Sequence, residues 1–155
     1  MAPPRAQATA PVDWSILSVS VSQLTLPVAR LKVPLYLGAP PPGPESPRDL
    51  CWLDTGAPLS VVPFHVHAQR LSWQPIPGIR ITWAGQPCDL GRIDAWLTTE
   101  QPPYLRGPFS LLAKFAQSDP PGDLMPVLLG LEFFLAHRAE FTMLLPPQHG
   151  VISLP

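Results

Sequence analysis

Three consecutive residues, Asp54, Thr55 and Gly56, have the clearest chemical potential in this chain. Apolar residues that favour β-structure flank them over Leu50–Leu53 and Leu59–Pro63, which predicts a tight turn between two buried strands. Gly56 lets backbone N–H groups approach the carboxylate, and such donors keep a carboxylate ionised in apolar surroundings. An Asx-type turn that only joins two strands would use the same residues, so the motif alone leaves both interpretations open.

A second informative segment lies far downstream. Two apolar residues and a glycine, Leu128–Gly130, precede the one short helix that we expect, Leu131–Arg138. A hydrophobic residue before Asp-Thr-Gly-Ala and a strand after it, combined with this later segment, resemble the retropepsins, which are single-domain aspartic peptidases. The resemblance covers most of residues 30–155, and a hairpin between the two segments and a terminal hairpin after the helix fit the same order.

The resemblance implies an all-β fold, a closed β-barrel or sandwich with one short helix near the C-terminus. It also implies an aspartic endopeptidase in which Asp54, Thr55 and Gly56 are catalytic and Thr55 hydrogen-bonds across a dimer. Because the sequence has a single Asp-Thr-Gly, the second carboxylate must come from a second copy by two-fold symmetry. Two adjacent carboxyls would share one proton and activate a water molecule. We therefore expect a homodimer that acts on a peptide or protein, without metal or cofactor.

Retropepsins close their site with a hairpin flap, for which Ile79–Leu90 is the best candidate here. Its expected tip is Ala84–Pro87, and Ile76–Gly78 is a second candidate tip. We predict that Ala57, Trp83 and Gly85 contact substrate. A half-buried strand aromatic is the alternative interpretation of Trp83.

The chain departs from the viral retropepsins at one pair of positions. There an acidic residue often follows Asp-Thr-Gly-Ala and an arginine follows the second glycine, whereas this chain has Pro58 and Leu131, with Glu132 next. Both partners are absent together, so no buried charge is left unpaired, but a familiar dimer contact is missing. The alternative function is therefore a binding or dimerisation module with weak or no catalysis. A third is an unrelated β-domain with a chance Asp-Thr-Gly turn.

Other reactive side chains give weaker signals. His65 and His67 alternate along the chain, but a zinc site needs three or four ligands and the remaining histidines lie far away in sequence, so we predict no metal site. Cys51 and Cys88 lack a metal-ligand spacing, and the sequence does not support a disulfide between them.

The composition limits the elements that can position these residues. The chain has 155 residues with 24 prolines, 46% apolar and 14% charged residues and a net charge of −1, which excludes a disordered or nucleic-acid-coating protein. Proline removes a backbone donor and fixes φ, so short strands are favoured over long helices. The strands that we predict, besides the two that flank Asp54, are Trp14–Val21, Ala29–Leu37, Ile79–Trp83, Leu90–Thr98, Phe109–Ala116, Val127–Gly130, Phe141–Leu145 and Val151–Leu154. The apolar spacing of Phe109–Ala116 would also suit a helix.

The chain reads as one domain with a short tail. Residues 1–12 are rich in proline and alanine and are expected to be a disordered tail, and residues 13–155 a single retropepsin-like domain. The N-terminus lacks the basic and apolar segments of a signal peptide, and no apolar run reaches membrane-spanning length. We therefore expect a cytoplasmic protein with neither a nucleic-acid nor a membrane partner.

Overall fold

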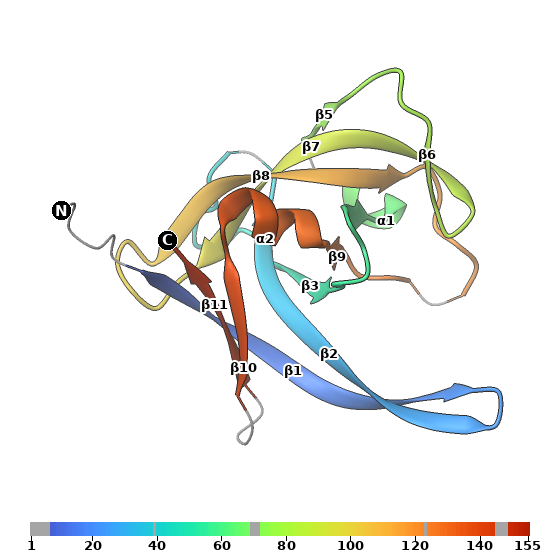
Figure 1. Cartoon of the computed structure of the whole chain (residues 1–155). Coiled ribbons are helices and arrows are strands. Elements are labelled where there is room, and N and C mark those ends of the chain that lie inside the picture. Colours follow the sequence, from blue (N-terminus) through green and yellow to red (C-terminus); the bar gives the residue numbers. More distant parts are fainter. Residues whose placement is uncertain (1–6, 39, 69–71, 123, 145–148) are drawn as a thin grey trace.

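The computed structural model describes residues 7–38, 40–68, 72–122, 124–144 and 149–155, and the chain is built mainly of strands (Figure 1). The prediction of an all-β chain with a short helix near the C-terminus is confirmed. The strands are β1 (Ala8–Val21), β2 (Leu24–Leu37), β3 (Asp49–Leu53), β4 (Ser60–Val62), β5 (Gln74–Pro75), β6 (Ile81–Trp83), β7 (Gln86–Thr98), β8 (Leu105–Ala116), β9 (Leu128–Leu129), β10 (Glu140–Leu144) and β11 (His149–Leu154), and the helices are α1 (Phe64–His67) and α2 (Leu131–His137).

Six of the strands close into a barrel. They follow the order β2, β3, β9, β4, β8 and β7, and β7 returns to β2 through the pairs Tyr36–Trp96 and Leu37–Ala95. The short strand β9 runs parallel to β3 and antiparallel to β4, so it lies between the two strands that flank Asp54. This arrangement confirms the predicted closed barrel.

Side chains that alternate along the strands fill the interior. On β8, Leu111, Ala113 and Phe115 are completely buried, whereas Leu112 and Lys114 between them are only partly buried. The sequence of this segment suited a helix as well as a strand. In the structure every second side chain is buried, which is the pattern of a strand. Phe133 of α2 packs into the same core.

Strand β1 begins at Ala8, inside the segment predicted to be a disordered tail. Ala8, Ala10 and Val12 are buried, and residues 8–13 pair with β11. The prediction for residues 1–12 is therefore wrong from residue 8 onward, while residues 1–6 lie outside the described part of the chain. The alternating alanines are small and only weakly hydrophobic, so they gave little indication of a buried strand. The prolines around them favoured the prediction of a disordered tail instead.

Strand β11 lies between β10 and β1 and pairs with both. The C-terminal strand, predicted at Val151–Leu154, therefore offers no free edge for pairing with another chain. Ile152 and Leu154 are buried in the core, so burial of their side chains, together with pairing on both sides, places β11 inside the sheet. Most of the predicted turn of this terminal hairpin, residues 146–150, lies outside the described residues.

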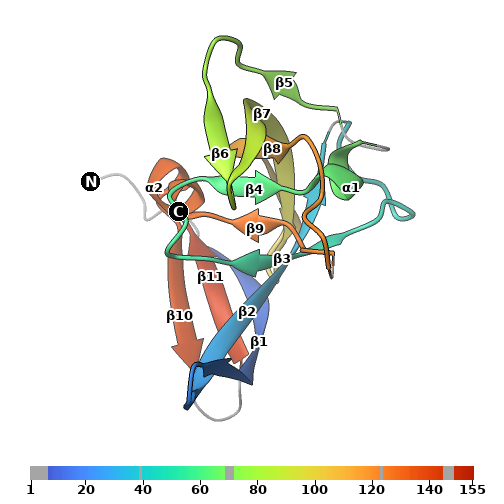
Figure 2. The same cartoon turned by 90° about the vertical axis from the view of Figure 1, so that its right-hand side faces the viewer.

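Strands β1 and β2 extend beyond the rest of the molecule as a two-stranded ribbon. Pairing of β1 with β11 stops at Asp13, and pairing of β2 with β3 starts only at Lys32. Residues 14–31 therefore pair only with each other, through a two-residue turn at Ser22 and Gln23. Figures 1 and 2 show this ribbon leaving the barrel. We call residues 15–29 the arm.

The helices are short. A single turn, α1, follows β4 and was not predicted, since Leu131–Arg138 was the only helix expected. Helix α2 agrees with that expectation, and the residue that follows it and caps it, Arg138, adopts a left-handed conformation. Within the described residues, no helix has the length and hydropathy required to cross a membrane.

Candidate active site

Asp54 directly follows β3, in the loop that leads to β4. Its backbone N–H donates to the carbonyl oxygen of Leu129 at 3.0 Å, which extends the pairing of β3 with β9 by one residue. The loop is therefore attached to β9 where it leaves the barrel. The segment Leu128–Gly130 therefore lies directly beside the start of the Asp54 loop.

The Asp54 carboxylate accepts a hydrogen bond within its own turn. Oδ1 accepts from the N–H of Gly56 at 3.0 Å, and the Asp54 carbonyl oxygen accepts from the N–H of Ala57 at 3.1 Å. A Cβ atom on residue 56 would lie 3.3 Å from Oδ1, so glycine keeps this approach unhindered. Asp54 is half-buried, whereas Thr55 and Gly56 are exposed. Since no described residue donates to Oδ2, this oxygen stays available for a water molecule or another carboxyl.

Helix α2 holds the far side of the same loop. The N–H groups of Leu131 and Glu132 donate to the carbonyl oxygens of Ala57 and Pro58 at 2.9 and 3.0 Å. Pro58 and Leu131 are the positions at which the sequence lacks the charge pair of the viral retropepsins. Here backbone hydrogen bonds join the loop to the helix, and they need no charged side chain.

The predicted flap is a hairpin. Strands β6 and β7 pair from Ile81–Cys88 to Trp83–Gln86 around a two-residue turn. Ala84 and Gly85 both have positive φ, 48° and 75°, so the turn is tighter than predicted and Gln86 already belongs to β7. In Figures 1 and 2 this hairpin lies on the side of the molecule where the β3–β4 loop lies. The side chain of Trp83 is half-buried and Gly85 is exposed.

The second candidate tip, Ile76–Gly78, precedes that hairpin. The N–H of Ile76 donates to the carbonyl oxygen of Leu90 at 2.8 Å, so this segment runs beside β7. Contacts of Ala57, Trp83 and Gly85 with substrate remain predictions.

The two histidines near β4 have local partners. Nδ1 of His65 lies 2.9 Å from Oδ1 of Asp119, and Nε2 of His67 donates to the carbonyl oxygen of Ala116 at 2.7 Å. Partial burial opposes the charged form of Asp119, but hydrogen bonds from the His65 side chain and backbone outweigh it, so the pKa of Asp119 is lowered. In the described part of the chain, no three His, Cys, Asp or Glu side chains come together as a metal site.

Both cysteines are free and buried. Burial raises the pKa of the Cys51 and Cys88 thiols, so neither is an activated nucleophile.

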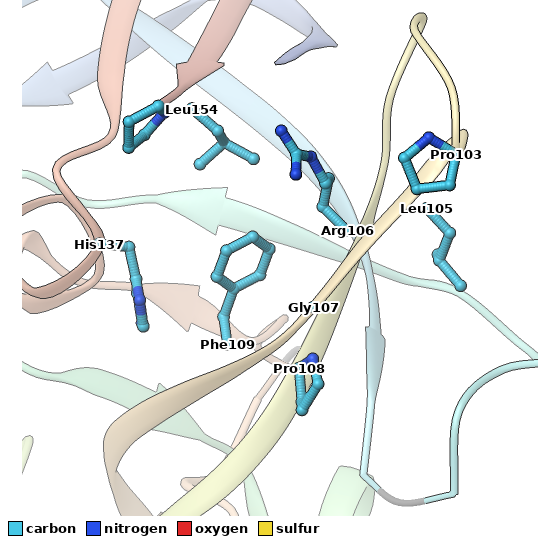
Figure 3. A pocket seen from close by; sticks show the side chains of 9 residues that line it. Pro103, Leu105, Arg106, Gly107, Pro108, Phe109, His137 and Leu154 are labelled. Atoms are coloured by element: carbon cyan, nitrogen blue, oxygen red, sulfur yellow. The ribbon is translucent and has the colours of Figure 1, made fainter. Parts of the chain in front are cut away.

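A cavity of about 380 Å³ lies between the start of β8, the end of α2 and the end of β11, among residues for which the sequence predicted no functional role. Figure 3 shows Arg106, Phe109, His137 and Leu154 around it. Arg106 lines this cavity beside apolar side chains, and its Nε is buried without a hydrogen-bond partner among the described residues. Its residues come from three distant segments, which is why no local motif marks it.

No protein-family model matches this chain, and no curated protein does either. Among solved structures, the chain is similar to a retropepsin-like aspartic protease from Rickettsia conorii, with 10% identity over 96% of this chain and 95% of that chain and a TM-score of 0.43. At that TM-score the likeness is distant. The functional interpretation therefore depends on the geometry of this chain.

Proposed function

We propose that this chain is one subunit of a homodimeric aspartic endopeptidase, with Asp54 as its catalytic carboxylate. The observation that carries the proposal is the Asp54 turn in the loop between β3 and β4, which is hydrogen-bonded to β9. In this turn one oxygen of the Asp54 carboxylate accepts a hydrogen bond and the other is available. The sequence has one Asp-Thr-Gly. A second copy is therefore needed to supply the other half of an acid–base pair.

In the proposed reaction, the two Asp54 carboxyls share one proton because two adjacent carboxylates cannot both ionise cheaply. The ionised carboxylate takes a proton from a water molecule, which attacks the carbonyl carbon of the peptide bond. The protonated carboxyl donates a hydrogen bond to the carbonyl oxygen, and proton transfer to the nitrogen then breaks the C–N bond. Thr55, which is exposed beside Asp54, would contact the second copy.

The β6–β7 hairpin serves as the flap in this proposal. Its tip is exposed and its base is fixed, because β7 pairs with β8 from Cys88 onward. Nζ of Lys114 on β8 also donates to the carbonyl oxygen of Thr82, midway along β6, at 2.9 Å. A hairpin fixed at its base and free at its tip is suited to close over an extended peptide. Trp83, Gly85 and Ala57 would then contact substrate.

The second candidate function is a dimerisation or binding module without catalysis. The arm favours it, because its apolar surface would drive association whether or not Asp54 reacts. Fold and function are separable, since the same barrel can carry a competent or an incompetent site.

The test is cleavage of a peptide library by the purified chain, at acid and neutral pH and over a range of protein concentrations. The proposal expects a rate per subunit that rises with concentration and is inhibited by pepstatin-type compounds. Asp54→Asn should abolish the rate, because the shared proton is lost, while circular dichroism stays unchanged.

Two outcomes separate the candidates. A chain that sediments as a monomer at every concentration and still cleaves peptides contradicts the shared-carboxylate mechanism. A dimer that cleaves nothing at either pH, with wild type and Asp54→Asn indistinguishable, favours the module.

A further inference from the structure

The arm has one apolar face and one polar face. In its register Val21 lies opposite Leu24, Val19 opposite Leu26 and Leu17 opposite Val28. Residues directly opposite in an antiparallel pair share a face, and so do alternate residues of one strand. All six side chains therefore lie on one face of the arm. The other face carries Ser18, Ser20, Thr25 and Pro27 toward the tip of the arm, with Ile16 and Ala29 at its base.

This apolar face has no cover within the described residues. Leu24 is 65% exposed, Val21 55%, Leu26 45% and Leu17 43%. An isolated two-stranded hairpin is marginally stable in water, and native proteins rarely leave such an apolar face open. Something must therefore cover it.

The arm also lacks the charges that normally protect such a ribbon. Residues 15–29 contain no Asp, Glu, Lys or Arg. The outer edges of both strands are unpaired beyond Asp13 and before Lys32. Charged side chains on exposed edges usually prevent pairing with another chain, and none is present here. An uncharged apolar surface is complementary to a second copy of itself.

The arm projects from the side of the molecule where a second copy has to approach. Figures 1 and 2 show the β3–β4 loop between the β6–β7 hairpin above and the arm below. A site completed by a second Asp54 needs its partner on this side.

The available area is of the order that a stable dimer requires. The six apolar side chains, of which Val19 and Val28 are only partly exposed, would provide on the order of 400 Å² per copy, or about 800 Å² in total, just below the roughly 1,000 Å² at which specific interfaces begin. Contacts around the Asp54 loops would add to this area.

We propose that the arm is the main dimerisation element of this protein, and that its apolar face is covered by a second copy of the chain. The arms of the two copies pack face to face or edge to edge about the two-fold axis and bring the two Asp54 loops together. This inference deepens the proposed function by naming the partner surface, but dimerisation through the arm does not itself need catalysis.

The experiment compares two double variants of the full chain by sedimentation velocity over a range of concentrations. Leu24→Lys with Leu26→Lys places two cations on the apolar face. Ser18→Lys with Ser20→Lys places the same charges, likewise two residues apart on one strand, on the other face and is the matched control. All four residues lie outside the core, so both variants should keep the wild-type circular dichroism spectrum and melting temperature.

The expected result is a dimer for wild type and for the control, with dissociation constants within about threefold. The apolar-face variant should dissociate at least about 100-fold more readily, since it brings like charges together and buries them. Equal dimerisation of both variants would overturn the proposal, and so would a wild type that stays monomeric at every concentration. A monomer that binds neutral phosphatidylcholine vesicles through this face would also overturn it and assign the arm to a membrane surface.

Peptide cleavage, measured on the same samples, separates this inference from the proposed function. If the arm-dependent dimer cleaves nothing, the endopeptidase fails and the arm proposal stands. If the apolar-face variant still dimerises and cleaves, the arm proposal fails and the endopeptidase stands.

Discussion

The backbone N–H of Gly130 donates to the buried hydroxyl of Ser60 at 3.0 Å, across 70 positions of the sequence. This bond joins the start of β4, just after the Asp54 loop, to the residue that opens α2. The backbones are in close contact here, because a Cβ atom on residue 130 would meet the carbonyl carbon of Leu59 at 2.4 Å. Residues 60 and 130 thus brace the loop that carries Asp54.

The Ser60 hydroxyl should be important for stability. Ser60→Ala leaves the buried N–H of Gly130 without its acceptor, which costs about 1–3 kcal/mol in the free energy of unfolding. Urea unfolding measures this loss. The control is Ser18→Ala on the exposed arm, which should change stability by less than about 0.5 kcal/mol. Equal effects of the two substitutions would show that the buried hydrogen bond is not needed.

Gly130→Ala tests the close packing itself. The added methyl group meets the backbone of Leu59 and Ser60 at 2.4–2.7 Å, so β4 or the start of α2 must shift. We expect a loss of about 2 kcal/mol or more in stability, together with reduced activity because the Asp54 loop moves. Gly43→Ala is the control, since a Cβ there meets nothing within 4 Å. A Gly130→Ala protein with unchanged stability and activity would contradict the bracing role.

The turn of the β6–β7 hairpin should respond in opposite directions to two substitutions. Both turn residues have positive φ, for which Asn-Gly is the preferred pair. Ala84→Asn should therefore stabilise the hairpin and Gly85→Ala should destabilise it, each by about 0.5–1 kcal/mol. Amide hydrogen exchange in β6 measures both effects. If the hairpin is the flap, each substitution also alters the turnover rate, because it changes how readily the hairpin opens. A change in the amide exchange rates of β6 without any change in turnover would argue against that role.

The Asp119–His65 contact predicts a pH-dependent contribution to stability. Because the pKa of folded Asp119 lies below its ordinary value near 3.8, this stabilisation is fully present above that value and is lost as the pH falls through the folded pKa. Asp119→Asn should therefore be less stable than wild type at neutral pH, by at most about 1 kcal/mol for so accessible a pair. The difference should vanish in strong acid. Urea unfolding of wild type and Asp119→Asn over the pH range tests this. The control is Glu45→Gln, at an exposed position. A difference in the free energy of unfolding that grows on acidification would contradict the prediction.

Local sequence patterns were sufficient for the parts of the site that are continuous in the chain. Asp54, Thr55 and Gly56 form their turn from adjacent residues, and Gly56 is needed where its N–H meets the carboxylate. Runs of apolar, β-forming residues predicted β3 and β4, and alternation of apolar residues predicted most of β7. Helix α2 followed from the apolar run after Gly130. These features depend on neighbours within a few residues, which one sequence displays directly.

The tertiary structure alone decided how the strands meet. Closure of the barrel depends on two pairs between β2 and β7, and β11 enters the sheet because β1 supplies a partner more than 100 residues earlier in the chain. The arm was also hidden, because Leu17, Val21 and Leu24 have the alternation of ordinary core strands. Whether such a strand is buried depends on what packs against it. That information is non-local, and no hydrophobic period within β1 or β2 contains it.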